Sequence, residues 1–428
     1  MTMALVLIIL VVLLIVGVPV AISMAVSGAF GLYMFGGLSI LTGILRTAPL
    51  SSTSSYEIIT VPMFILMAEF VIISGIANDL FRAAAMWVGR VRGGVAMATV
   101  LAGAGFAAIS GSSTAAAATL ASTSIPAMVR QGYEPKLAGG VVAISGTLAM
   151  IIPPSIALIL YGVIADISIS ALFIGAIIPG VLVCLSIILT IAALVYLWPD
   201  SAPKGQSYSF KEKLQSLSRI GPVLILFIVV IGSIYSGLAT PTEASGVGAF
   251  VAMLLALKER RLTLRALVHA LRKTAHTTAM ILLIILAAHI FGYYFTLERV
   301  TNDLITWVGQ LDLPPIAIMA VILLGYVILG FFMDQVAILI LTVPVVLPLV
   351  VSLGFDPVWF GVVVVVTAEV GMVTPPLGMN IFVVARYTKM PLNELFVGVM
   401  PHVWVHLLVI ALLVLFPQLI LWLPSTMQ

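Results

Sequence analysis

Charged residues are scarce in this sequence: Asp, Glu, Lys and Arg together make up 8% of its 428 residues. A soluble domain contains about 25%, so the composition excludes a soluble globular protein. Apolar residues account for 62% of the chain and form long runs, such as 171–195 and 281–295. These runs predict helices, because lipid offers a bare backbone group no hydrogen-bond partner. We therefore expect an all-α polytopic membrane protein in a lipid bilayer.

Cysteine and catalytic motifs are also scarce. The single cysteine, Cys184, lies in an apolar run and cannot form an internal disulfide. Neither HExxH nor GxSxG is present, so the chain lacks the usual signatures of a membrane-embedded protease or hydrolase. The net charge of +3 is too small to indicate nucleic-acid binding. We expect no enzymatic activity, no organic cofactor and no nucleic-acid partner.

The chain does contain an internal repeat. Residues 1–197 match a drifted copy that lies 222 positions later, with a small internal deletion between Asn302 and Trp307. The aligned pairs include Gly132-Tyr133-Glu134-Pro135 with Gly354-Phe355-Asp356-Pro357, Pro126 with Pro348, and Pro153-Pro154 with Pro375-Pro376. One register held across so many turn residues indicates a duplication. We predict a first repeat over 1–197, a linker over 198–219 and a second repeat over 220–428.

Corresponding loops of the two repeats carry opposite charge. Segment 79–92 holds three arginines and one acidic residue, whereas its counterpart 298–312 holds three acidic residues and one arginine. Because Lys and Arg mark cytoplasmic loops, this reversal predicts that the repeats have inverted topology and that the linker is cytoplasmic. Inversion requires an odd number of crossings per repeat. We count five helices if segment 94–128 enters and leaves on one side: 1–17, 18–36, 58–76, 137–164 and 170–197.

We interpret 94–128 and its counterpart 314–353 as two re-entrant hairpins. The first is interrupted by the polar run Ser110-Gly111-Ser112-Ser113-Thr114, and the second by Met333-Asp334-Gln335. Non-helical backbone at membrane depth persists only inside the protein or along a cavity, so the two tips should meet inside the molecule. The alternative is that small residues such as Ser112 and 115–118 merely allow close helix packing. The polar partner and Asp334 favour the hairpins.

Two further segments, about 137–164 and about 358–390, should form broken helices. Each contains a proline doublet, which removes backbone donors and blocks the preceding turn. A break exposes carbonyl groups that suit a cation and amide groups that suit an anion. Polar residues flank both doublets: Thr147, Ser155, Thr374 and Asn380. This pattern is expected of discontinuous helices at the midplane site of a transporter.

Several motifs together resemble one family, the large membrane subunit of tripartite ATP-independent periplasmic (TRAP) transporters. The resemblance covers essentially the whole chain. It is carried by Ile109-Ser110-Gly111-Ser112-Ser113, Ile152-Pro153-Pro154-Ser155, Gly237-Leu238-Ala239-Thr240-Pro241-Thr242-Glu243-Ala244 and Thr374-Pro375-Pro376-Leu377-Gly378-Met379-Asn380.

The resemblance implies sodium-coupled import of an organic anion, usually a carboxylate such as a C4-dicarboxylate or a sugar acid. It implies an elevator in which a transport domain, built from both hairpins and both broken helices, slides against a scaffold domain. The implied partners are a periplasmic substrate-binding protein and a separate small four-helix membrane subunit. The implied location is the cytoplasmic inner membrane of a bacterium or archaeon. A free-standing divalent-anion/sodium symporter, which needs no binding protein, is the alternative.

The family's sites, carried over by residue, imply two sodium sites and one substrate site. The first sodium site would comprise Gly111, Ser112, Ser113, Gly146 and Thr147, beside the break at Pro153, and the second Met333, Asp334, Gly371, Met372 and Thr374. Hydroxyl, carbonyl and carboxylate oxygens are hard donors that suit a hard cation. The substrate would lie between the tips, near Ser113, Thr114, Ser155 and Asn380.

Three acidic residues in apolar segments need a separate explanation, because a charge in lipid is costly. For Glu243 a structural hydrogen bond is favoured over a role in transport. Glu369 would either tune the second sodium site or satisfy backbone groups near the break. Glu69 is a functional candidate without an assigned role.

Overall fold

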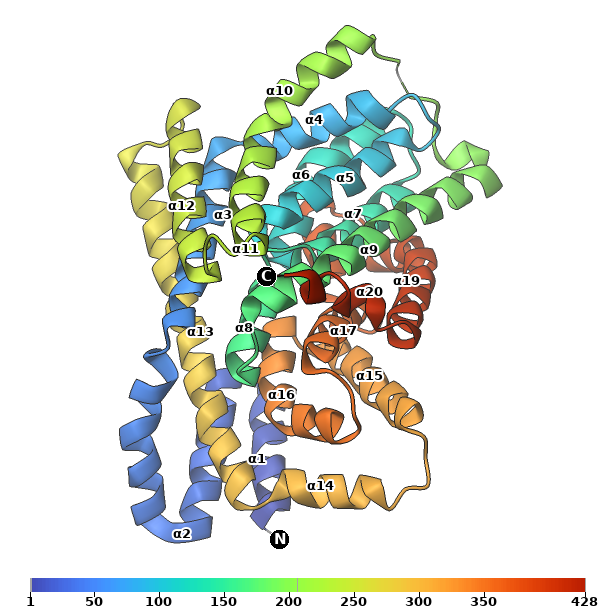
Figure 1. Ribbon diagram of the computed structural model, residues 1–428. Coiled ribbons are helices and arrows are strands. Elements are labelled where there is room, and N and C mark those ends of the chain that lie inside the picture. The colour runs from blue at the N-terminus through green and yellow to red at the C-terminus, as the bar shows by residue number, and fades with distance from the viewer. Residues whose placement is uncertain (1, 206, 428) are drawn as a thin grey trace.

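The computed structural model describes residues 2–205 and 207–427, and every regular element in them is helical (Figure 1). The first half of the chain forms α1 (Thr2–Ile15), α2 (Val20–Thr53), η1 (Tyr56–Ile59), α3 (Thr60–Ser74), α4 (Ile76–Val88), α5 (Gly94–Ser110), α6 (Ser113–Arg130), α7 (Pro135–Ile151), α8 (Ile156–Ala165), α9 (Ile169–Leu197) and η2 (Pro199–Ser201). The second half forms α10 (Phe210–Phe227), η3 (Ile228–Gly232), α11 (Ser233–Tyr235), α12 (Pro241–Lys258), α13 (Leu264–Leu297), α14 (Val300–Gly309), α15 (Pro315–Phe332), α16 (Gln335–Ser352), α17 (Pro357–Gly371), α18 (Met379–Thr388), α19 (Leu392–Leu415), α20 (Gln418–Leu421) and η4 (Pro424–Thr426).

Eight helical segments in the described residues are long and apolar enough to cross a membrane, or nine if the bent segment at 210–235 is one span. This confirms the predicted all-α polytopic membrane protein. Both α15 and α16 satisfy the length and composition of a span. The re-entrant course of the hairpins and the inversion of the repeats therefore stay predictions.

Two segments contain more helix than we expected. The helix predicted to end at residue 36 instead resumes after a break at Gly36–Gly37 and continues to Thr53. Gly37 has φ of 68°, a conformation that glycine adopts without a steric cost, so the chain turns there and begins a second helical arm. The predicted linker 198–219 contains the first turns of α10. They begin at a capping box in which Ser209 N–H donates to Glu212 Oε2 at 2.7 Å.

The long helices of the two halves pack together on one side of the molecule (Figure 1). The α13 helix contacts α2 and α3, and α12 contacts α3. Glycine permits the closest of these approaches, because a Cβ at Gly28 would lie 2.8 Å from Cα of Phe291. At Gly31 a Cβ would lie 2.6 Å from the ring of Tyr294. The α5–α8 and α15–α18 helices form a second group, in which α6 contacts α18 and α16 contacts α8.

Candidate functional site

The first hairpin tip lies between α5 and α6. Gly111 has φ of 56° and lies against the break between α7 and α8, where a Cβ would be 3.3 Å from the carbonyl oxygen of Pro154. Glycine therefore suits this position both for its backbone conformation and for its size. Ser112 caps α6, since the Ala115 N–H donates to Ser112 Oγ at 3.4 Å.

The second tip, between α15 and α16, also has a capping side chain, but the preceding Met333 is extended where Gly111 is left-handed. Asp334 caps α16 by accepting a hydrogen bond from the Ala337 N–H at 2.8 Å, and its side chain is exposed. The next residue, Gln335, is fully buried and donates through Nε2 to the carbonyl oxygen of Val365 on α17 at 2.8 Å. This hydrogen bond ties the second tip to the second broken helix.

Both predicted breaks are present. The first separates α7 from α8 at residues 152–155, where Ser155 caps α8 by accepting a hydrogen bond from the Leu158 N–H at 3.3 Å. The second separates α17 from α18 at residues 372–378. The proline doublet is buried in the first break and exposed in the second. Both Pro-Pro peptide bonds are cis.

The two tips share one cavity of about 600 Å³. Five of the predicted sodium or substrate residues from the tips line it: Gly111, Ser112, Ser113, Thr114 and Asp334. Met372 of the second break and Met379, the first residue of α18, also line it. The expectation that the polar tips meet inside the molecule therefore agrees with the geometry.

The other predicted site residues lie off the cavity wall. Gly146 packs against Ala117 of α6, and Gly371 packs against Gly330 of α15. Two hydroxyls donate to helix carbonyl groups: Thr147 Oγ1 to the Ile144 oxygen at 2.7 Å within α7, and Thr374 Oγ1, from the second break, to the Val370 oxygen of α17 at 2.5 Å. The remaining three also have structural positions: Met333 follows the end of α15, Ser155 caps α8, and Asn380 is buried in α18, where its side-chain amide has no hydrogen-bond partner in the part of the chain that the structure describes.

The cavity also contains an ion pair that the motifs did not reveal. Lys273 Nζ on α13 lies 2.6 Å from Glu69 Oε1 on α3, and both residues line the cavity. From the sequence, Glu69 has no assigned role, and Lys273 is predicted only as the end of a basic amphipathic stretch, Arg260 to Lys273, at the membrane interface. The cost of an acidic residue in an apolar helix indicated that Glu69 has a partner, but did not say which.

The three acidic residues of the apolar segments have different environments. Glu69 has its ion pair, whereas Glu243 forms a capping box with Thr240, whose N–H donates to Glu243 Oε2 at 2.8 Å. The structural hydrogen bond favoured for Glu243 is therefore present. Glu369 is fully buried near the end of α17, and neither carboxylate oxygen has a hydrogen-bond partner among the described residues.

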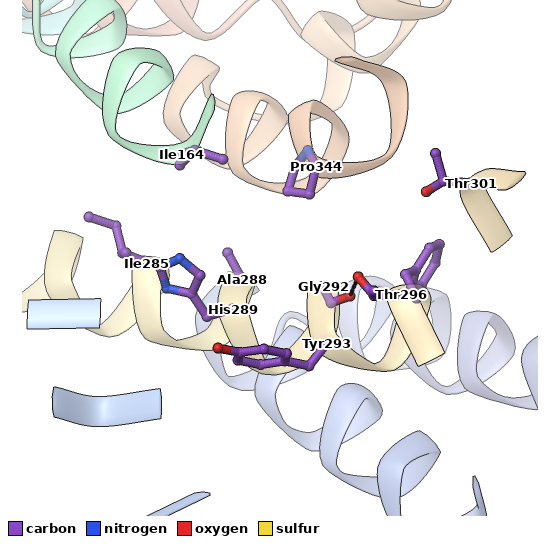
Figure 2. Close-up of a pocket in the computed structure, with 10 residues that line it drawn as sticks. Ile164, Ile285, Ala288, His289, Gly292, Tyr293, Thr296, Thr301 and Pro344 are labelled. Carbon is purple, nitrogen blue, oxygen red and sulfur yellow. Dashed lines mark hydrogen bonds between the residues drawn. The ribbon is translucent and has the colours of Figure 1, made fainter. Parts of the chain in front are cut away.

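A second cavity, of about 240 Å³, separates α13 from α8 and α16. Figure 2 shows His289 and Tyr293 on the α13 side and Ile164 of α8 and Pro344 of α16 on the other. His289 Nδ1 is 2.7 Å from Ser52 Oγ on the second arm of α2. The two groups of helices are thus incompletely packed against one another here.

The comparison with known families identifies the chain. Residues 7–419 match the family described as "Tripartite ATP-independent periplasmic transporter, DctM component". The chain belongs to the DctM family. It is a TRAP transporter large permease, a multi-pass membrane protein of a bacterial transporter family and not an enzyme.

Relatives of this DctM protein transport several solutes. It is 33% identical to the C4-dicarboxylate large permease DctM of Pseudomonas aeruginosa, with 94% of each chain covered. It is 32% identical to the sialic acid large permease SiaM of Vibrio cholerae, over 96% of this chain and 95% of the relative. It is also 32% identical to the isethionate permease DctMQ of Oleidesulfovibrio alaskensis, over 94% of this chain and 63% of that relative.

A solved structure shows a similar fold. The transporter YdaH of Alcanivorax borkumensis superposes with a TM-score of 0.63 over 88% of each chain, at 16% identity.

Proposed function

We propose that this DctM protein is the sodium-coupled subunit that imports an organic anion across the cytoplasmic membrane by an elevator movement. A periplasmic binding protein delivers the anion, and a separate small four-helix permease completes the complex. A small permease and a binding protein are the other components of a tripartite transporter of this family. The named solutes of two relatives, C4-dicarboxylates and sialic acid, are anions and support this substrate class.

The shared cavity carries the proposal. Its charged lining consists of Asp334, Glu69 and Lys273, so two carboxylates and one ammonium leave a formal charge of −1. An anion alone would be repelled from such a cavity, whereas one bound monovalent cation would bring the formal charge to zero and remove this repulsion. Asp334 presents a carboxylate to the cavity, and Ser112 and Thr114 present hydroxyls. These hard oxygen donors fit sodium as the co-transported ion.

The packing supports an elevator. The tips and broken helices belong to one group of helices, whereas α2, α3, α12 and α13 form the other. The cavity in Figure 2 lies between the groups, where movement of one against the other needs a surface that is not tightly interlocked. We assign the first group to the transport domain and the second to the scaffold.

The test is uptake of radiolabelled organic acids into proteoliposomes. The chain alone is compared with the chain plus its small permease and binding protein, each with and without a sodium gradient. Uptake that requires all components and sodium is the expected result. Uptake by the chain alone would instead indicate a free-standing symporter, and uptake that is independent of sodium would overturn the coupling.

A further inference from the structure

The ion pair between Lys273 and Glu69 joins α13 to α3 at the wall of the shared cavity. The two side chains differ in exposure: that of Glu69 is 9% exposed and that of Lys273 is 50% exposed. The carboxylate is therefore held inside the protein, while half of the lysine side chain remains open. Both residues belong to the group of helices that faces the hairpin tips.

The ammonium has hydrogen-bonding capacity left over. A lysine ammonium carries three N–H donors, and Glu69 is the ion-pair partner of Lys273 within residues 2–205 and 207–427. Of the described residues that line this cavity, Lys273 is the one with a positively charged side chain. A buried carboxylate such as Glu69 needs a positive partner to offset its desolvation, which explains the pair but not the exposure of Lys273 to the cavity.

We propose that Lys273 binds the anionic group of the transported solute and that Glu69 is an internal competitor that weakens this binding. The inference rests on the proposed function and adds the residue that recognises the anion. The solute anion and Glu69 both contact the Lys273 ammonium. The anion approaches it from the cavity, on the side that Glu69 does not occupy. The hairpin tips contact the solute from the opposite group of helices, so the anion bridges the two groups.

This arrangement gives Lys273 and Glu69 opposite effects on affinity. Lys273→Gln removes a charged hydrogen-bond donor and should raise KM about 10- to 100-fold, the range for loss of a charge-assisted contact. Glu69→Gln removes the competing charge but keeps a carbonyl oxygen beside the ammonium. Its KM for the anion should fall, by about threefold to tenfold if about 1 kcal/mol of repulsion is removed. The maximal rate should change little in either variant, because both changes act on binding.

The experiment measures uptake by the complete transporter, with succinate, sialic acid and isethionate as the probe anions. Arg272→Gln is the matched control, since it removes one positive charge from the adjacent residue of α13, which does not line the cavity. Lys273→Arg keeps the charge and should retain a KM close to that of the unmodified protein. The double variant Glu69→Gln with Lys273→Gln leaves no unpaired buried charge and should still show the raised KM.

The outcomes separate the inference from the proposed function. If the unmodified transporter takes up a probe and Lys273→Gln has the KM of Arg272→Gln, the inference is wrong and the function stands. A fall in maximal rate at unchanged KM in both single variants would assign the pair a structural role, which also overturns it. If the unmodified transporter takes up no probe, the proposed function fails. Thermal stabilisation of the purified complex by each anion then decides the inference. Stabilisation of the unmodified complex that is lost in Lys273→Gln supports the inference. If no anion stabilises the unmodified complex, the inference is overturned.

Discussion

The two hairpin tips each place a capping side chain before the following helix but differ in charge. Ser112 and Asp334, which lie 222 residues apart, each cap the helix that follows the tip. At the same offset, Ser113 corresponds to Gln335 and Thr147 to Glu369. The first set consists of neutral hydroxyls, whereas the second includes two carboxylates. The comparison teaches that a duplicated scaffold can keep its helix geometry while the electrostatics of its two halves diverge.

The two helix breaks also differ, in length and in exposure. The first is short and its prolines are buried, whereas the second extends over residues 372–378 and its prolines are exposed. Ser155 caps the helix after the first break, but Gly378, with φ of 61°, precedes the helix after the second. We therefore expect the second half to bind the coupling cation more strongly and the first half to contribute more to rigidity.

Asp334→Asn should produce the largest effect on this comparison. Asparagine retains the helix cap but removes the formal charge of the second tip. We expect the apparent affinity for sodium to fall about 100-fold, as for the loss of about 3 kcal/mol of charged interaction. The sodium concentration dependence of uptake measures this apparent affinity. Asp356→Asn is the control, because Asp356 caps α17 in the same way and lies off the cavity. Equal sodium affinity in both variants would contradict the assignment.

Glu369→Gln should have the next largest effect. The side chain is buried, and its carboxyl group has no hydrogen-bond partner within residues 2–205 and 207–427, so a cation bound nearby would favour its charged form. We expect sodium affinity to fall about tenfold, as for a residue that supports metal ligands, and a smaller fall for Thr147→Val in the first half. Sodium-dependent thermal stabilisation of the purified protein measures the sodium affinity of both variants. A larger effect of Thr147→Val would reverse the ranking of the two halves.

Ser112→Asp tests whether charge alone accounts for the difference. It makes the first tip resemble the second and keeps a residue that caps helices well. If the added carboxylate contributes about 1 kcal/mol, sodium affinity should rise about fivefold. The same sodium titration measures it, with Ser122→Asp, on the exposed face of α6, as the control. No rise in affinity would show that the first tip lacks the other donors a cation needs.

Ser112→Ala should have the smallest effect. The capping hydrogen bond at Ser112 is long, at 3.4 Å, compared with 2.8 Å at Asp334. We expect a loss of about 0.5 kcal/mol in stability, the low end for a helix cap. Thermal unfolding in detergent should show a larger loss for Asp334→Ala. If the order were reversed, the first tip would depend on its cap more than the geometry indicates.

Much of the site was predictable because its residues interrupt long apolar segments. The proline doublets predicted both breaks, and the polar residues near 111 and 334 predicted both tips to within a few residues. The second arm of α2 was missed. The helix resumes beyond the break at Gly36–Gly37, and its side chains Ile40 and Ile44 pack in one hydrophobic cluster with Phe291 of α13.

The sequence by itself determined the membrane environment, the helix breaks and the positions of the polar tips. These depend on local chemistry, because lipid requires every backbone group to find a partner and proline removes one. Only the tertiary structure decided which distant residues meet. Helix packing decides three such contacts: the pairing of Lys273 with Glu69, the hydrogen bond from Gln335 to Val365, and the common cavity of the two tips. Packing of this kind is set by many weak contacts acting together, and no local pattern in the chain encodes it.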